Sequence, residues 1–202
     1  MEFLDNIHKA VSHQILTNKV KNALKGAVSQ SGKSARRNLK LAENEAGQEG
    51  ARQALEKFET ASIKILLDFT RDQVKIATSA LWWEIEVRLG LAKLGLTQGE
   101  EIAAKNKETL QSLDLVLDHE IESLSDLRGK GVNLPSHEWL ARNLYLTVYN
   151  HAGSLTNNPQ ENNYPPEIKE ILIPAAKEAS DIIKSHAQEK IASLSENSNR
   201  KT

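Results

Sequence analysis

Between residues 55 and 94, apolar side chains recur at the three- and four-residue intervals of an α-helix. One face holds Leu55, Phe58, Ile65, Phe69, Ile76, Ala80, Trp83, Val87, Leu91 and Leu94, and the other holds Ile63, Leu67, Val74, Leu81 and Ile85. A helix that is apolar on two sides has to be covered on two sides. We therefore expect this segment to be the central helix of a bundle. Both rings of Trp82-Trp83 are expected to pack between helices, and an anchor for an interface is the alternative.

The ends of this and the next helices are predicted by glycines and capping residues. The central helix should end near Gly90 or Gly95, and Thr97-Gln98-Gly99-Glu100 has the form of a capping box that begins the next one. That second helix should stop at Gly129-Lys130-Gly131. Ser136 or Asn133 can then cap a third helix.

In the last third of the chain, the sequence predicts a loop followed by a final helix. Residues 153 to 164, GSLTNNPQENNY, are expected to form the loop, and Pro165-Pro166 can open the last helix. Pro174 should kink or divide that helix. No segment alternates with the period of a strand. The expected fold is all-α, a bundle of five to seven helices with a long central helix, in an extended or an oligomeric form.

The chain divides by charge, although its net charge is only −1. Its first 42 residues hold eight basic and two acidic side chains, whereas the rest holds 18 basic and 25 acidic ones. We therefore expect a basic amphipathic helical arm at 1–42, a helical bundle at 43–194 and a disordered tail at 195–202. Seven basic residues of the arm are the candidate contacts to an anionic partner: Lys19, Lys21, Lys25, Lys33, Arg36, Arg37 and Lys40.

The arm is also amphipathic, with an apolar face formed by Phe3, Leu4, Ile7 and Val11. This apolar stripe changes direction near residues 16 to 18, so the two halves of the arm can face different partners. An anionic membrane surface fits the combination of apolar and basic residues. Nucleic acid is the weaker candidate because no aromatic residue lies between Leu4 and Lys57. Packing of the arm on the acidic remainder, or on a second copy, is equally compatible.

Residues 26 to 37, GAVSQSGKSARR, contain the end of a phosphate-binding loop but not its beginning. The motif GxxxxGK[ST] needs glycine at its first position, where this chain has Ala27. The preceding residues also have the period of a helix, whereas a phosphate-binding loop follows a strand. We expect no nucleotide site, and we predict a turn from Ser29 to Ser34.

Catalytic and metal-binding patterns are absent from the sequence. There is no cysteine, and the six histidines form no HxxxH, HExxH or ExxH spacing. Asp114 and Asp118, near His119, Glu120 and Glu122, could gather a cation or form a solvated acidic face, and the solvated face is the expectation. We therefore expect no catalytic residue, no metal and no cofactor.

One arrangement points to an alternative ligand site. Asp68, Asp72 and Lys75 lie at positions i, i+4 and i+7, and His137 and Trp139 follow on a later helix. Over four or five positions this resembles the headgroup site of the glycolipid-transfer proteins, which are all-helical. The family has asparagine where this chain has Asp72, and no tryptophan lies midway between the two clusters. The resemblance does not establish membership, and such spacing is common on the outer face of a helix.

These patterns favour a non-enzymatic interaction or scaffold protein. Its partner would be a second copy or another helical protein, and its basic arm would also contact an anionic surface. Without a signal peptide or a membrane span in the sequence, we expect a soluble cytoplasmic protein that can lie peripheral to a membrane. The alternative is a small-ligand or lipid-binding protein, or an enzyme, with a pocket between helices.

If the partner of the arm is an anionic surface, reversing the charge of Lys33, Arg36 and Arg37 should weaken binding to anionic vesicles. Added salt should weaken it too, because exposed charges are screened beyond ~8 Å at physiological ionic strength. Co-sedimentation with vesicles measures both effects. Equal binding by the reversed and unchanged chains would remove the arm as the contact.

Overall fold

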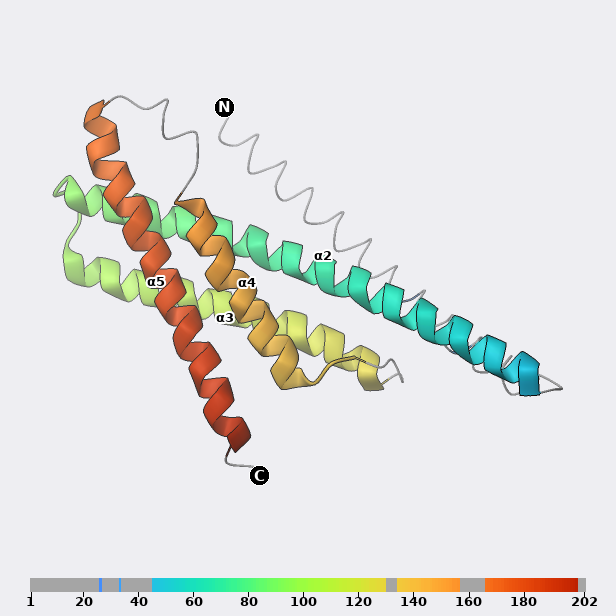
Figure 1. Ribbon diagram of the computed structural model, residues 1–202. Helices are drawn as coiled ribbons and strands as arrows, with labels where there is room; N and C mark the ends of the chain where they lie inside the picture. The colour runs from blue at the N-terminus through green and yellow to red at the C-terminus, as the bar shows by residue number, and fades with distance from the viewer. Residues whose placement is uncertain (1–25, 27–32, 34–44, 130–133, 157–165, 200–202) are drawn as a thin grey trace. The chain divides into compact units, whose positions relative to one another are not determined.

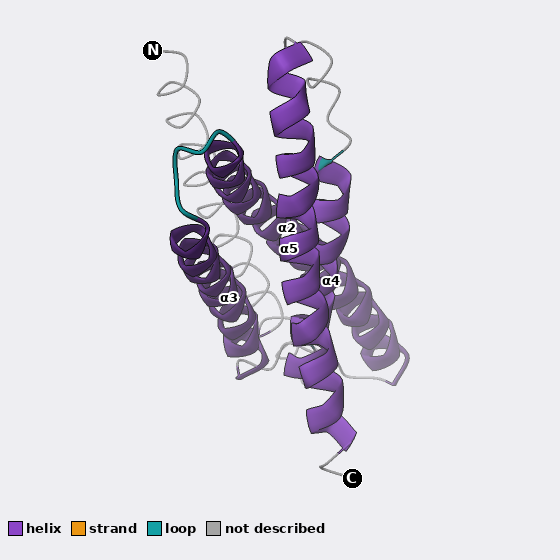
Figure 2. Cartoon of the chain, turned by 90° about the vertical axis from the view of Figure 1, so that its left-hand side faces the viewer, coloured by secondary structure: helices purple, strands orange, loops and turns teal. Residues whose placement is uncertain are grey.

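The computed structural model describes Gly26, Lys33 and residues 45–129, 134–156 and 166–199. Within these ranges the chain forms four helices, α2 (Glu45–Lys93), α3 (Gly99–Gly129), α4 (His137–Leu155) and α5 (Pro166–Asn199) (Figure 1). The described residues contain no strand (Figure 2). The all-α prediction is confirmed, while a count of five to seven helices is not confirmed by these ranges. Of the basic residues predicted to bind a partner, only Lys33 is described; it is helical and exposed, not in a turn.

Helix α2 ends at Lys93 and is followed by a turn at Gly95, close to the second of the two predicted ends. Gly95 has a φ of 71°, a left-handed conformation that a side chain would strain. The amide of Gly95 donates to the carbonyl of Ala92 at 2.8 Å, and the amide of Leu96 donates to that of Leu91 at 3.0 Å. These two bonds satisfy carbonyls that the last turn of α2 would otherwise leave unpaired.

The starts of α3 and α4 are fixed by local hydrogen bonds. Ser136 caps α4, because its side chain accepts from the amide of Trp139 at 3.1 Å. In α3 the first helical acceptor is the carbonyl of Gln98, which bonds the amide of Ile102. The cap position is therefore one residue later than the predicted Thr97. Helix α3 is described as far as Gly129, the first residue of the predicted stop at Gly129-Lys130-Gly131; the other two lie outside the described residues.

Two segments are more helical than their composition predicts. Helix α4 continues through Gly153 to Leu155, although the loop was expected to begin at residue 153. Helix α5 begins at Pro166 as expected, but Pro174 does not divide it, and it runs to Asn199 through most of the expected tail. Pro174 is exposed, so water can reach the carbonyl that lacks its amide partner. Burial of the neighbouring face overrides these local preferences.

The chain forms two compact units. The described part of unit 1 comprises residues 45–73, 122–129 and 134–135. Its buried aliphatic side chains are Leu66, Leu124, Leu127 and Leu134. The guanidinium of Arg128, near the end of α3, donates to the carbonyls of Leu134, at 3.2 Å, and Pro135.

Unit 2 contains residues 74–121, 136–156 and 166–199 of the described chain. One face of each helix supplies its core, whose largest fully buried side chains include Val74, Ile85, Leu113, Leu117, Ile121, Leu140, Leu144, Val148 and Ile183. Helices α4 and α5 pack against each other. The buried face of α5 is rich in alanine, with Ala175, Ala176, Ala179 and Ala187, and small side chains allow helix axes to approach closely.

Buried hydrogen bonds connect the helices of unit 2. The indole Nε1 of Trp82 on α2 donates to Ser180 Oγ on α5 at 3.0 Å, and Ser180 Oγ donates to the carbonyl of Ala152 on α4 at 2.6 Å. Arg88 on α2 donates to Thr109 Oγ1 on α3 at 2.7 Å. All four helical segments of the unit are therefore joined through polar atoms of α2 and Ser180.

Removing the Ser180 hydroxyl should destabilise the protein. In Ser180→Ala the buried indole amine of Trp82 loses its acceptor, which should lower the free energy of unfolding by about 1–3 kcal/mol. Urea unfolding followed by circular dichroism measures the change. Ser185→Ala, an exposed serine on the same helix, is the matched control and should stay within about 0.5 kcal/mol of the unchanged chain. Equal effects of the two variants would contradict a structural role for Ser180.

Candidate functional site

The outer face of α2 in unit 2 is apolar and exposed. Trp83, Val87, Leu91 and Leu94 are 49%, 37%, 38% and 54% exposed. Ala80 is also exposed, and Ile76 is half-buried. The sequence predicted cover on both sides of this helix, but the described residues cover one side only. We call Ile76, Ala80, Trp83, Val87, Leu91 and Leu94 the α2 stripe.

The two adjacent tryptophans have opposite environments. Trp82 is 7% exposed and hydrogen-bonded to Ser180, whereas half of Trp83 is exposed. Neighbouring residues on a helix point about 100° apart, so only one of the two rings can lie at the centre of the core face. The expectation that both rings pack between helices is wrong for Trp83.

The α2 stripe has the spacing of a helix-packing seam. Ile76 and Trp83 are seven residues apart, and so are Ala80, Val87 and Leu94. These two interleaved sets have the spacing of the a and d positions of a heptad, which contact a neighbouring helix in coiled coils. Leu91 belongs to neither set, and the next d position is Gly90, which is buried against Leu172 of α5. The stripe is therefore a candidate surface for a helical partner.

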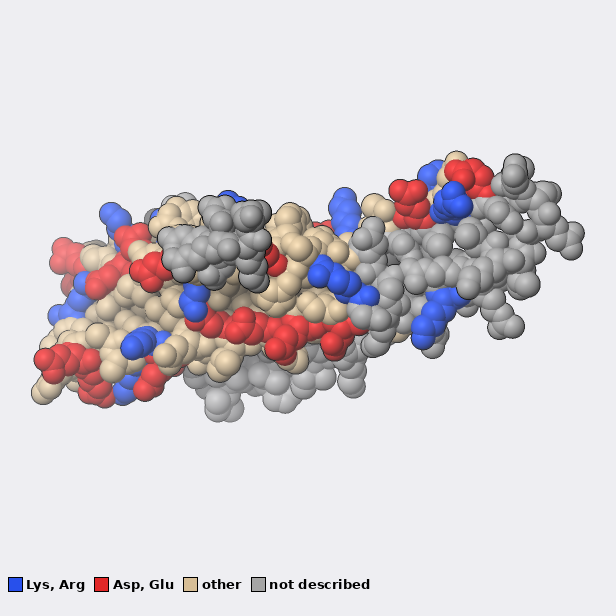
Figure 3. All heavy atoms as spheres, turned by 90° about the horizontal axis from the view of Figure 1, so that it is seen from below, with Lys and Arg blue, Asp and Glu red and all other residues tan. Residues whose placement is uncertain are grey.

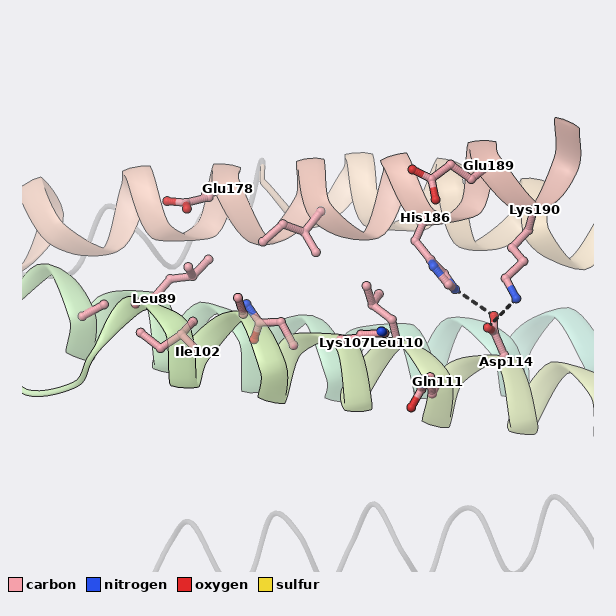
Figure 4. A pocket seen from close by; sticks show the side chains of 15 residues that line it. Leu89, Ile102, Lys107, Leu110, Gln111, Asp114, Glu178, His186, Glu189 and Lys190 are labelled. Carbon is pink, nitrogen blue, oxygen red and sulfur yellow. Dashed lines mark hydrogen bonds and ion pairs between the residues drawn. The ribbon is translucent and has the colours of Figure 1, made fainter. Parts of the chain in front are cut away.

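A second candidate site is a cleft of about 740 Å³ between α3, α5 and the end of α2, all within unit 2 (Figure 4). Its apolar wall is formed by Leu89, Ala92, Ile102, Ala103, Leu110 and Ile182. Its polar lining consists of Asn106, Lys107, Gln111, Asp114, Glu178, His186, Glu189 and Lys190. Figure 4 shows Leu89 and Ile102 towards one end and Asp114, His186 and Lys190 towards the other. Most of the apolar lining is therefore at one end, where Figure 4 also shows Glu178 on α5, and the Asp114 cluster is at the other.

Asp114 is the centre of the polar end. Its Oδ1 accepts from Tyr145 Oη and lies 2.8 Å from His186 Nε2, and its Oδ2 lies 2.7 Å from Lys190 Nζ. Burial raises the pKa of Asp114, but hydrogen bonds from Lys190, His186 and Tyr145 outweigh burial and leave this pKa below its usual value. Burial and the bond to Asp114 raise the pKa of Tyr145, so its hydroxyl stays protonated and donates.

This arrangement corrects the expectation of a solvated acidic face at Asp114. The side chain of Asp114 is only 16% exposed, whereas Asp118, His119 and Glu122 are exposed and Glu120 is buried. The partners of Asp114 come from α4 and α5, at 31 to 76 residues' distance in the chain. Spacing within α3 alone could not identify them.

His151 on α4 forms a separate polar contact with α2. Its Nε2 lies 2.7 Å from Ser79 Oγ, and its Nδ1 lies 3.4 Å from Ser154 Oγ. Burial and the charge of Lys75 lower the pKa of His151. A serine and not a carboxylate faces the second ring nitrogen, so the pair lacks the acid that orients the base in a hydrolase triad.

The residues of the predicted alternative ligand site lie on exposed helix surface. In unit 1, Asp68 pairs with Arg71 at 3.0 Å and Asp72 is exposed. In unit 2, Lys75, His137 and Trp139 are exposed and none of them lines the cleft. The predicted apolar face of the arm, Phe3, Leu4, Ile7 and Val11, and the basic residues Lys19, Lys21, Lys25, Arg36, Arg37 and Lys40 lie outside the described residues.

Across the described ranges, no three His, Asp or Glu side chains are grouped so that they could hold a metal ion. Nor is any helix in these ranges both long and apolar enough to cross a membrane. On the face seen in Figure 3, acidic side chains form a continuous row. This row agrees with the acidic excess of the chain beyond residue 42.

The lowered pKa of His151 predicts a loss of stability in weak acid. As pH falls below about 6.5, His151 is protonated more readily in the unfolded chain than in the folded one. The contribution of neutral His151 to the free energy of unfolding is therefore complete above that pH and decreases below it. In His151→Gln, which keeps a polar neighbour for Ser79, this part of the decrease should disappear. Urea unfolding between about pH 7.5 and pH 5 measures it. His119→Gln, at an exposed histidine, is the control, and parallel curves for His151→Gln and the unchanged chain would contradict the prediction.

No family model, no curated protein sequence and no solved structure matches this chain.

Proposed function

We propose that this protein is a non-enzymatic helical interaction protein that pairs with a second copy of itself through the α2 stripe. The observation that supports this most directly is the exposure of three large apolar side chains on one face of α2, Trp83, Val87 and Leu91, and of Leu94 directly after the helix. Contiguous apolar surface of this kind marks interaction sites in folded proteins. Its heptad spacing favours another helix as the occupant.

A second copy is the partner that the geometry of the stripe fits best. A two-fold axis through the middle of the stripe would place Val87 near Val87 of the other chain, so the same apolar surface would serve both sides. The net charge of −1 offers little electrostatic repulsion between copies. The ion pair between Glu84 and Arg88 would lie at the border, where charged side chains commonly flank an apolar interface.

The basic arm at 1–42 would supply a second contact, to an anionic surface. Its excess of eight basic over two acidic residues supports this part of the proposal. Pairing through α2 would double the number of arms in one assembly, which strengthens binding to a surface without any new contact. The protein would then act in the cytoplasm and lie peripheral to a membrane, with no catalytic step.

Two charges in the stripe should separate the copies. Val87→Glu combined with Leu94→Glu would bury four carboxylates in the paired form, which is costly unless they are neutralised. Light scattering should give about twice 22.4 kDa for the unchanged chain and 22.4 kDa for the double variant.

The matched control is Leu115→Glu, at a leucine on α3 that is 69% exposed and outside the stripe. This variant should keep the mass of the unchanged chain. A monomeric unchanged chain at micromolar concentration, or a doubled mass that survives both stripe substitutions, would refute pairing through α2.

A further inference from the structure

The cleft in unit 2 has the size and the wall of a small-molecule site. Its volume of about 740 Å³ lies within the ~300–1,000 Å³ of typical ligand pockets. Leu89, Ala92, Ile102 and Ala103 line it near the junction of α2 and α3, and Ile182 faces them from α5. An aliphatic chain placed against these residues would leave water for an apolar surface, which is favourable.

At the polar end of the cleft, the carboxylate of Asp114 is already bound by side chains of the protein. Asp114 has three partners, Tyr145, His186 and Lys190, and Figure 4 shows His186 and Lys190 pointing from α5 towards Asp114 on α3. A carboxylate held by three donors has little capacity left for a cationic ligand. The Lys190 ammonium uses one of its three hydrogens on Asp114 and keeps two for another acceptor.

A second cation lies two helical turns away on the same wall. Lys107 precedes Asp114 by seven residues, so these two lie on one side of α3, whereas Figure 4 shows the Gln111 side chain on the side of α3 away from α5. Lys107 forms no ion pair with another described residue. Glu178 pairs with Lys93 at 3.0 Å, and Figure 4 shows Glu178 and Glu189 beside the α5 ribbon. The cationic donors that remain available are therefore those of Lys107, in the middle of the cleft, and of Lys190, at its polar end.

We propose that this cleft binds an amphipathic anion, with an aliphatic chain against Leu89, Ile102 and Ile182 and a carboxylate between Lys107 and Lys190. The site lies on the α3 and α5 side of α2, whereas the α2 stripe faces away from the core, so ligand binding and pairing of copies would use different surfaces. If the protein did not pair through the α2 stripe, ligand binding in the cleft could still be measured, and the reverse also holds.

Decanoate is a suitable probe, with decanol and decyltrimethylammonium as neutral and cationic molecules that carry the same chain. Calorimetry with the full chain should show saturable binding of decanoate and weaker binding of the other two. Lys107→Gln should weaken decanoate binding by roughly three- to tenfold and leave decanol unchanged, because it removes only the charge. Lys105→Gln, at an exposed lysine on α3 outside the cleft, is the matched control and should change neither.

A second variant tests the apolar half. Ala103 is exposed in the cleft, so Ala103→Trp can fill the space without disturbing the core, and it should abolish binding of decanoate and decanol alike. Circular dichroism checks that the fold is retained. No saturable binding of decanoate, tighter binding of the cationic probe, or unchanged affinity in both Lys107→Gln and Ala103→Trp would each overturn the proposal.

Discussion

The hydroxyl of Ser180 is the polar atom at which three helices of unit 2 meet. It accepts from Trp82 on α2 and donates to the carbonyl of Ala152 on α4, while its own residue lies on α5. The bond from Trp82 can form only when its face of α2 is turned towards α5, which is the rotation of α2 that also buries the apolar residues of that face. That rotation places Ile85 and Leu89 in the core and Trp83 and Val87 outside. Both candidate sites follow from this orientation of α2.

Local features could be predicted from the sequence because their causes lie within a few residues. Gly95 ends α2 because the C-cap needs a positive φ, and Ser136 begins α4 because its hydroxyl bonds an amide three residues later. The extent of α4 could not be predicted in the same way. Gly153 favours a loop by composition, but Ala152 beside it is fully buried and bonded to Ser180, so tertiary packing keeps that turn helical.

The two candidate sites depend on contacts that no short pattern contains. The apolar character of both faces of α2 was evident from the sequence, but which of them is covered depends on α3, α4 and α5. Trp82 and Trp83 show this most clearly, since neighbouring positions in one motif have 7% and 49% exposure. The cleft depends on Asp114 meeting His186, which is 72 residues later in the chain. The charge of Asp114 suggested a solvated surface, whereas its contacts connect α3 with Tyr145 on α4 and with His186 and Lys190 on α5.

The separation between Trp82 and Ser180 also has a consequence for synthesis of the chain. These residues are 98 positions apart, so the acceptor of the indole is made long after α2 has left the ribosome. At about 5–20 residues per second, the interval is roughly 5–20 s, far longer than helix formation requires. During that time the part of α2 that α5 later covers would be open to chaperones or to other nascent chains. Helix α5 is thus the segment whose arrival completes the core.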